Sequence, residues 1–209
     1  MNAFQTPAAI TVALDLAVAN VTVIASNRTD TTVEVKPTDA NKKADVQAVE
    51  QTQVSFADNT LSVQTPKGWR TSLKGKSSIE VTVQVPSGSQ VNGTVAAGAL
   101  LGSGPLGYSN VELSLGDITI AQPQGSVTAK VAQGNITIGE AVRGLLELET
   151  AVGAIEVGIH PGSAAVLKTN TPNGAVSNQL GPVAQTGDTV EVHAKTSTGN
   201  ITLHNTTAV

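Results

Sequence analysis

The 209-residue sequence contains no cysteine, which excludes disulfides, thiolate catalysis and zinc sites with cysteine ligands. Aromatic residues make up only 2% of the chain, so the core must be aliphatic. A net charge of −4 argues against a general nucleic-acid-binding protein. No run approaches the roughly 20 apolar residues of a membrane-spanning helix, and the first residues lack the basic segment of a signal peptide. We therefore predict a cytoplasmic protein without an integral membrane segment.

The sequence does contain an internal repeat. Glycines recur from Gly98 to Gly162 in steps of nine residues, with a single step of ten. The segment 116–120, which reads Gly-Asp-Ile-Thr-Ile, returns with asparagine in second place at 134–138, and again with a final leucine at 199–203. Self-similarity at a fixed period indicates stacked structural repeats.

Alternating apolar and polar residues within each unit predict strands with one buried face, as where Thr119 separates Ile118 from Ile120. Nine residues suffice for one strand of roughly 16 Å and a tight corner, so eighteen form a coil of two strands. We predict an all-β protein, a short two-sheet parallel β-solenoid of about five coils. Beyond Gly162 the spacing loosens, and either Ala165 with Leu167 or Ala164 with Val166 fits the inward positions.

The repeated glycines are expected where the backbone turns sharply, and the Asp or Asn after them tolerates the same geometry. A calcium column is the alternative, because Asp117 and the asparagines share one position. Calcium prefers six to eight oxygens including several carboxylates, and the other equivalent positions are Ala154 and Ala175. We therefore favour structural corners and amide stacking. The predicted corner positions are Gly116, Asp117, Gly134, Asn135, Gly153, Gly199 and Asn200.

Residues 1–90 are strand-rich but irregular, and we interpret them as a β-sandwich-like cap on the solenoid of residues 91–209, with both forming one continuous unit. The cap is expected to contain one short helix over about 41–50, with Asp39 or Asn41 as its N-cap. Its buried stripe would contain Ala44, Ala48 and Val49. The strands expected in the cap cover residues 10–16, 19–25, 32–35, 52–56, 60–64 and 78–85.

The order of an opening strand pair, a small helix, a hairpin and segment 79–88 leading into the repeats resembles the DUF4097 family. Its members are bacterial β-solenoid proteins often labelled putative adhesins, also called toast-rack domains. Segments 158–165 and 189–202 are similar to the soluble, single-domain actinobacterial members. The resemblance implies this fold and no catalytic motif. Membrane-attached relatives are associated with envelope-stress sensing, and this chain departs from them because it has no transmembrane segment.

A basic loop contains the chain's single tryptophan. Gly68 and Gly75 are seven residues apart, a spacing that differs from the phosphate-binding loop motif. The loop is a candidate for contact with an anionic partner or a membrane surface, and a solubilising loop anchored by one aromatic residue is the alternative. Its candidate binding residues are Lys67, Trp69, Arg70, Lys74 and Lys76.

The three histidines are His160, His193 and His204. By alternation His193 and His204 point outward and could lie near each other on one face, where only Glu191 adds a ligand. A solvated surface is therefore favoured over a metal site, and we predict neither metal nor cofactor.

A glycan-active enzyme is the catalytic alternative, because β-helices with clustered carboxylates and aromatic platforms cleave polysaccharides. Glu147 and Glu149 share an outward face, but the other acids are dispersed and Tyr108 is the solenoid's only aromatic residue. We predict no catalytic residues and no enzyme.

The predicted function is that of a non-catalytic binding or scaffold protein, whose partner is another protein or a second copy. A homodimer through the C-terminal coil at the exposed end of the solenoid is a secondary hypothesis. An envelope-stress sensor or adhesin-like surface protein is the first alternative, and a glycan-active β-helix enzyme is the second.

Overall fold

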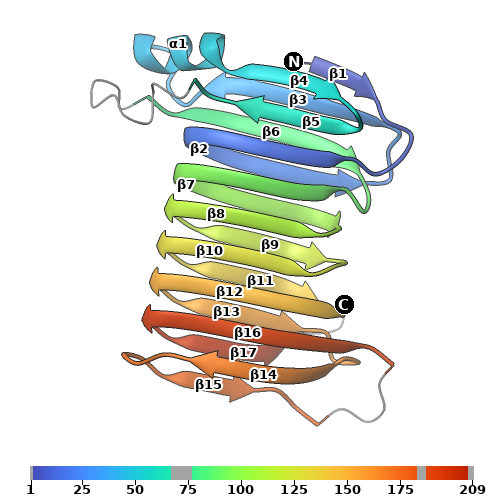
Figure 1. Cartoon of the computed structure of the whole chain (residues 1–209), viewed down its shortest axis with the longest axis vertical. Helices are drawn as coiled ribbons and strands as arrows, with labels where there is room; N and C mark the ends of the chain where they lie inside the picture. The colour runs from blue at the N-terminus through green and yellow to red at the C-terminus, as the bar shows by residue number, and fades with distance from the viewer. Residues whose placement is uncertain (1, 67–76, 183–186, 207–209) are drawn as a thin grey trace.

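The computed structural model describes residues 2–66, 77–182 and 187–206, which form a tall stack of parallel β-coils closed at one end by an irregular cap (Figure 1). The predicted all-β solenoid is confirmed. Each coil contributes one strand to each of two facing sheets, which we call the β8 sheet and the β9 sheet after one member of each. Successive coils pair in parallel, with residues in register.

The regular coils begin at β7, a long strand that bends around a corner and belongs to both sheets. Within the described residues, β7 and the strands after it form six coils, compared with about five expected. Their strands are β7 (Gln90–Leu106), β8 (Ser109–Leu115), β9 (Ile118–Pro123), β10 (Val127–Gln133), β11 (Ile136–Ala141), β12 (Gly144–Val152), β13 (Ile155–Ile159), β14 (Ala164–Asn170), β15 (Val176–Gln179), β16 (Thr189–Thr198) and β17 (Ile201–Asn205).

The cap extends both sheets rather than forming a separate layer. The predicted strands 10–16 and 19–25 are two halves of one bent strand, β2, which pairs with β7 along its length. Above β2, parallel pairing gives way to antiparallel pairs between β3 and β6 and between β4 and β5. The elements are β1 (Asn2–Gln5), β2 (Thr11–Ser26), β3 (Asp30–Pro37), α1 (Lys43–Gln51), β4 (Gln53–Ala57), β5 (Thr60–Gln64) and β6 (Ile79–Pro86).

The core between the sheets consists of stacked aliphatic columns. Ile118, Ile136 and Ile155 occupy equivalent positions in three successive coils, and each is 0% exposed. Because the side chains of a strand alternate between its two faces, every second residue is buried in this way. The same alternation places the intervening residues on the outer surface of each sheet, where they are available for binding.

At the far end of the stack, chain order and spatial order differ. Strands β16 and β17 lie between the coil β12–β13 and the coil β14–β15, with parallel pairing on both sides. The expectation that the most C-terminal coil ends the solenoid is therefore wrong. The end coil is β14–β15, because the chain runs past the position of β16–β17 and then returns to fill it (Figure 1).

The structure decides the inward phase of β14, which the sequence left open. Ala165 and Leu167 pack against the core, whereas Val166 points outward and is 49% exposed. Their registry with Val190 and Val192 of β16 sets this phase. The inward residues of the end coil therefore continue the apolar columns of the solenoid.

The helix starts later than predicted, and its N-cap residue is Lys42, which makes no side-chain capping bond. Asp39 instead accepts a hydrogen bond from the Asn41 N–H. The buried acid Asp45 accepts hydrogen bonds from the backbone N–H groups of Asp39, at 3.2 Å, and Ser78, at 3.0 Å. Asp45 therefore ties the first turn of α1 to the start of β6. Of the predicted stripe, Ala48 is buried, and Ala44 and Val49 are half-buried.

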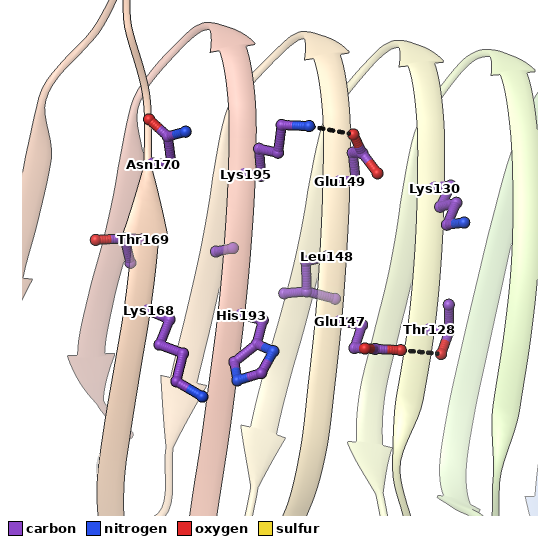
Figure 2. Close-up of a pocket in the computed structure, with 11 residues that line it drawn as sticks. Thr128, Lys130, Glu147, Leu148, Glu149, Lys168, Thr169, Asn170, His193 and Lys195 are labelled. Atoms are coloured by element: carbon purple, nitrogen blue, oxygen red, sulfur yellow. Dashed lines mark hydrogen bonds and ion pairs between the residues drawn. The ribbon is translucent and has the colours of Figure 1, made fainter.

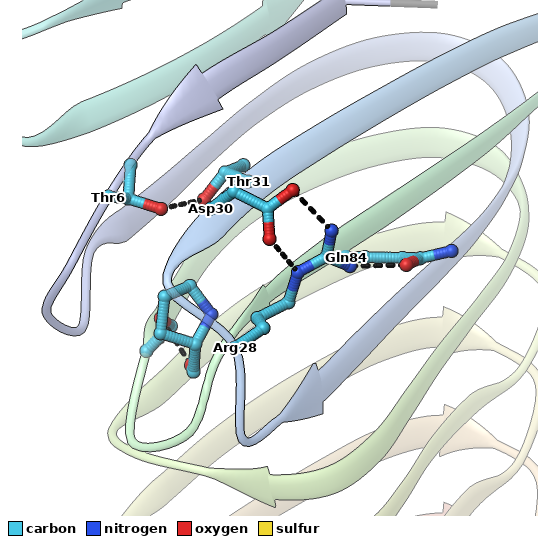
Figure 3. Close-up of polar contacts among 7 residues, drawn as sticks. Thr6, Arg28, Asp30, Thr31 and Gln84 are labelled. Atoms are coloured by element: carbon cyan, nitrogen blue, oxygen red, sulfur yellow. Dashed lines mark hydrogen bonds and ion pairs between the residues drawn. The ribbon is translucent and has the colours of Figure 1, made fainter.

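A second polar cluster in the cap lies around the start of β3 (Figure 3). Both carboxylate oxygens of Asp30 accept hydrogen bonds from the Arg28 guanidinium at 2.9 Å, and Arg28 also donates to the side-chain oxygen of Gln84. The hydrogen bond from Arg28 lowers the pKa of Asp30. Nearby, the buried hydroxyl groups of Thr6 and Thr31 are 2.8 Å apart and hydrogen-bonded. These contacts join β3 to β6 and to the segment that follows β1.

Candidate binding face

The predicted corner glycines form a column along one narrow side of the solenoid. Gly116, Gly134, Gly153 and Gly199 all have φ between +125° and +153°. A Cβ atom on Gly134 would lie 1.9 Å from the carbonyl oxygen of Gly116 in the next coil, and the other corners are equally tight. Only glycine combines this backbone conformation with such a close approach between coils.

The Asp and Asn residues after these glycines connect neighbouring coils. Asp117 Oδ1 accepts a hydrogen bond from the Asn135 N–H at 2.7 Å, and Asn135 Oδ1 accepts one from the Ala154 N–H at 2.8 Å. Asn200 Oδ1 accepts one from the Ala175 N–H at 3.0 Å. Each side-chain oxygen is thus used to satisfy a backbone donor. Among the described residues there is no cluster of three or more potential metal ligands.

The basic-loop residues Lys67, Trp69, Arg70, Lys74 and Lys76 all lie in the segment 67–76, outside the described residues. Their role in binding stays a prediction from the sequence.

The predicted proximity of His193 and His204 is wrong. His193 lies on β16 in the β8 sheet and His204 on β17 in the β9 sheet, so their outward side chains are on opposite faces of the molecule. Each histidine instead contacts an acid on its own face. His193 Nε2 is 2.7 Å from Glu191 Oε1, and His204 Nε2 is 3.2 Å from Glu156 Oε1.

The outer face of the β8 sheet carries an ordered set of charges. Parallel registry aligns one residue from each of four adjacent strands, β8, β10, β12 and β16, into a row across the sheet. The charges alternate along the row, and all four side chains are exposed. We call this the charged row, and it consists of Glu112, Lys130, Glu149 and Lys195.

A second row runs beside the charged row, two residues earlier on each strand. We call it the mixed row, and it consists of Asn110, Thr128, Glu147 and His193. Thr128 Oγ1 is 3.3 Å from Glu147 Oε2. Glu147 and Glu149 do share an outward face, as expected, and each belongs to a different row.

On this face, residues of β10, β12, β16 and β14 surround a shallow hollow of about 480 Å³ (Figure 2). Its floor lies over the strands at Leu148 and Ala194, whose side chains point inward to the core, and Lys168, Thr169 and Asn170 of β14 line its far side. The hollow is open along its length, so an extended surface can be accommodated as well as a small molecule.

Two ion pairs at the hollow consist of accessible side chains. Lys195 Nζ lies 3.0 Å from Glu149 Oε1, and Lys168 Nζ lies 2.9 Å from Glu191 Oε1, with all four side chains between 42% and 64% exposed. Hydrogen bonds from Lys168 and then His193 hold the pKa of Glu191 below its ordinary value. Glu191 is therefore ionised at neutral pH and acts as an acceptor.

Glu147, Glu149 and Glu191 were singled out from the sequence, but Glu112 and the lysines of this face were not. Lys130, Lys168 and Lys195 were not singled out, because each is isolated in the sequence. The signal was available in the repeat itself, since Glu112, Lys130 and Glu149 occupy equivalent positions in successive coils. Aligning the coils by their corner glycines would have revealed the alternation.

No family model matches the chain, and no curated protein matches its sequence. Among solved structures, it is similar to a protein from Clostridium sporogenes described as a "putative cell adhesion protein", with a TM-score of 0.50 and 13% identity over 98% of both chains. This likeness supports the fold.

Two further matches have TM-scores below 0.5. A "putative adhesin" from Bacteroides fragilis matches with a TM-score of 0.39 and 14% identity over 97% of this chain and 95% of the other. A "putative lipid binding protein" from Parabacteroides distasonis matches with a TM-score of 0.37 and 11% identity over 99% and 96%. At these identities a likeness concerns the fold alone. In the described part of the chain, no helix is long and apolar enough to span a bilayer.

Proposed function

We propose that this protein is a non-catalytic binding protein that engages a protein partner through the outer face of the β8 sheet. The observation that carries the proposal is the charged row, in which four exposed side chains of alternating charge are held at fixed spacing by the parallel coils. Neighbouring strands are about 4.8 Å apart, so the pattern is rigid. Such arrays favour selective contact with a complementary surface.

The state of the acids supports a binding role over glycan cleavage. A glycosidase needs one carboxylic acid that keeps its proton near neutral pH. At the hollow, Glu149 is in contact with Lys195 and Glu147 with Thr128, while Glu191 has a lowered pKa. Glu191 is therefore an ionised acceptor, and Glu147 and Glu149 each have a hydrogen-bond donor beside them, an arrangement that suits recognition of a surface.

The test is an affinity capture from native extract with the partner identified by mass spectrometry. We expect Lys130→Glu to lose the captured protein, because the reversal places three adjacent acids in the charged row. The matched control is Glu156→Lys, a single reversal on the outer face of the β9 sheet, which should capture as the natural protein does. Equal capture by both variants would remove the proposed face, and a companion variant with serine at Lys67, Arg70, Lys74 and Lys76 tests the basic loop.

The alternatives are separated by different measurements. An adhesin-like or envelope-sensing protein must be found outside the membrane, so cell fractionation distinguishes it from the predicted cytoplasmic location, which stays a prediction. A glycan-active enzyme would release sugars from polysaccharide and lose this activity in Glu147→Gln and Glu149→Gln. We expect no such release from the natural protein.

A further inference from the structure

We infer that the partner of this face is a second copy of the chain, bound face to face about a two-fold axis that runs parallel to the strands between β10 and β12. This inference rests on the proposed function, because it names the occupant of the same surface. A two-fold axis in this position reverses the order of the coils while each row faces its own copy. Such a dimer is favourable only if each row is complementary to the same row read in the opposite order.

The charged row meets this condition. From β8 to β16 its signs are negative, positive, negative, positive, and the reversed order is positive, negative, positive, negative. About the proposed axis, Glu112 opposes Lys195 of the second copy and Lys130 opposes its Glu149. By symmetry each pairing occurs twice, so four opposite-charge contacts form and no like charges meet.

The mixed row is compatible with the same axis. Reversal places Thr128 opposite Glu147 of the second copy, and Asn110 opposite its His193. Both are donor and acceptor combinations. Next to the charged row on the other side, the exposed residues at the two central strands are Ala132 and Ala151, which leave the backbones free to approach.

The available area is adequate for a weak dimer. The six strands from β7 to β14 span about 29 Å at 4.8 Å per strand, and six residues along each strand span about 20 Å. One face therefore offers roughly 600 Å² and the pair roughly 1,200 Å², at the lower limit of specific interfaces. Exposed ion pairs add little affinity, so we expect a dimer that depends on concentration and weakens in salt.

The opposite face lacks this order. The aligned row on the β9 sheet reads Thr119, Thr137, Glu156 and Thr202, with one charge among four positions. Reversal places Glu156 opposite Thr137, so this row encodes no charge complementarity. The two outer faces thus supply an internal comparison, in which only the face of the β8 sheet favours a second copy.

Analytical ultracentrifugation of the full chain over a wide concentration range tests the inference. In 50 mM salt we expect a monomer–dimer equilibrium whose dissociation constant rises at least tenfold in 500 mM salt. Lys130→Glu and Glu149→Lys should each weaken the dimer at least tenfold. Either change gives residues 130 and 149 the same charge, and the two-fold axis brings them together at two places in the dimer. Glu156→Lys should leave the constant within twofold.

The decisive variant combines Lys130→Glu with Glu149→Lys. Within one chain the double reversal puts like charges side by side, but across the proposed axis residue 130 still opposes residue 149 with opposite sign. We therefore expect dimerisation to return to within about threefold of the natural protein. Thermal unfolding of each variant verifies that the coils remain folded.

A chain that is monomeric at every concentration overturns the inference, as does a dimer insensitive to Lys130→Glu or a double reversal that fails to restore pairing. A dimer lost only on changing Val166 in β14 would assign association to the end of the solenoid and would also overturn it. The proposed function fails separately. A monomeric protein that captures another protein, and loses it in Lys130→Glu, keeps the binding face and removes the second copy as its occupant.

Discussion

The two ends of the solenoid are finished in different ways. At the N-terminal end, parallel coils give way to antiparallel strands, the helix α1 and a stacked pair of rings, Phe4 and Phe56, whose centroids are 5.2 Å apart. At the other end, the coil β14–β15 has the same form as the interior coils, and its inward residue Val176 is 46% exposed. The first end has dedicated covering elements, whereas the second relies on the composition of one coil.

That composition shows how a repeat can end without a cap. At inward positions of the end coil, Thr169 and Asn178 align with the buried Ala194 and Leu203 of the preceding coil. Polar substitution lowers the cost of leaving these positions in water. Stability should therefore be concentrated toward the capped end, and matched substitutions at the two ends test this difference.

The largest expected effect comes from the corner glycines. In Gly98→Ala the new Cβ would lie 1.9 Å from the Ala19 carbonyl oxygen at a φ of +133°, where β7 of the first coil pairs with β2 of the cap. We expect a loss of more than about 4 kcal/mol in the free energy of unfolding. Gly174→Ala has an equal clash, 1.8 Å from the Gly199 oxygen, but should disturb only the end coil and cost about 2 kcal/mol.

Chemical denaturation measures both losses in the free energy of unfolding. Gly187→Ala is the control, because no heavy atom of the described residues beyond its chain neighbours lies within 4 Å of its added Cβ. Equal losses for Gly98→Ala and Gly174→Ala would mean that the two ends unfold as one cooperative unit.

The next effect concerns one leucine at each end. Leu61 lies in the cap strand β5 and is 0% exposed, whereas Leu167 is only partly buried against the core. We expect Leu61→Ala to lower the free energy of unfolding by about 3 to 4 kcal/mol and Leu167→Ala by about 1 kcal/mol. Thermal unfolding followed by circular dichroism measures the loss of stability in each variant. A larger loss at Leu167 would contradict the proposed difference between the ends.

A smaller effect, with a pH dependence, is expected at Asp45 in the cap. Burial opposes ionisation, but the hydrogen bonds from Lys42 and from the N–H groups of Ser78 and Asp39 lower the pKa of this carboxyl overall. Asp45→Ala should cost about 2 kcal/mol at neutral pH because two backbone donors lose their acceptor.

Since the pKa is lower in the folded state, this contribution is present above about pH 4 and is lost as the pH falls through the folded-state pKa. Unfolding curves between pH 3 and pH 7 should therefore converge for variant and natural protein at the acid end. If the free energies of unfolding of variant and natural protein differ by the same amount across that range, ionisation of Asp45 does not contribute to the pH dependence of stability.

The smallest effect is expected at the exposed strand. Val166 points outward on β14 and is 49% exposed. Val166→Lys should change the free energy of unfolding by less than about 0.5 kcal/mol, and amide exchange should remain fast in β14 relative to β8. A loss above 1.5 kcal/mol would show that another surface covers this strand.

The sequence allowed the repeat, the alternation and the corners to be predicted because each depends on local rules. The glycine spacing gives the coil length, and the period of two gives the buried face. The hairpin around Asp58 and Asn59 was also predictable, because Asp and Asn favour tight turns between strands. In the structure both residues have positive φ at this turn. These features need no knowledge of distant contacts.

The order of the end coils and the charged row were not predictable in the same way. β14 and β16 both have strand-forming patterns. Which of them pairs with β12 depends on how the side chains of neighbouring coils pack together. The N-cap of α1 differed because Asp39 and Asp45 bind backbone groups of the adjoining loop and of β6. Such choices depend on tertiary contacts, which local pattern does not contain.

The insertion of β16–β17 between earlier coils has a consequence for synthesis. During translation β14 and β15 emerge before the strands that are their only partners in the described structure, because β14 pairs with β16 and β15 with β17. The ribosome therefore releases a segment that must wait, unpaired, for some twenty further residues. Vectorial assembly of this protein can proceed coil by coil down to β13, and then requires a pause in which the later strands are placed first.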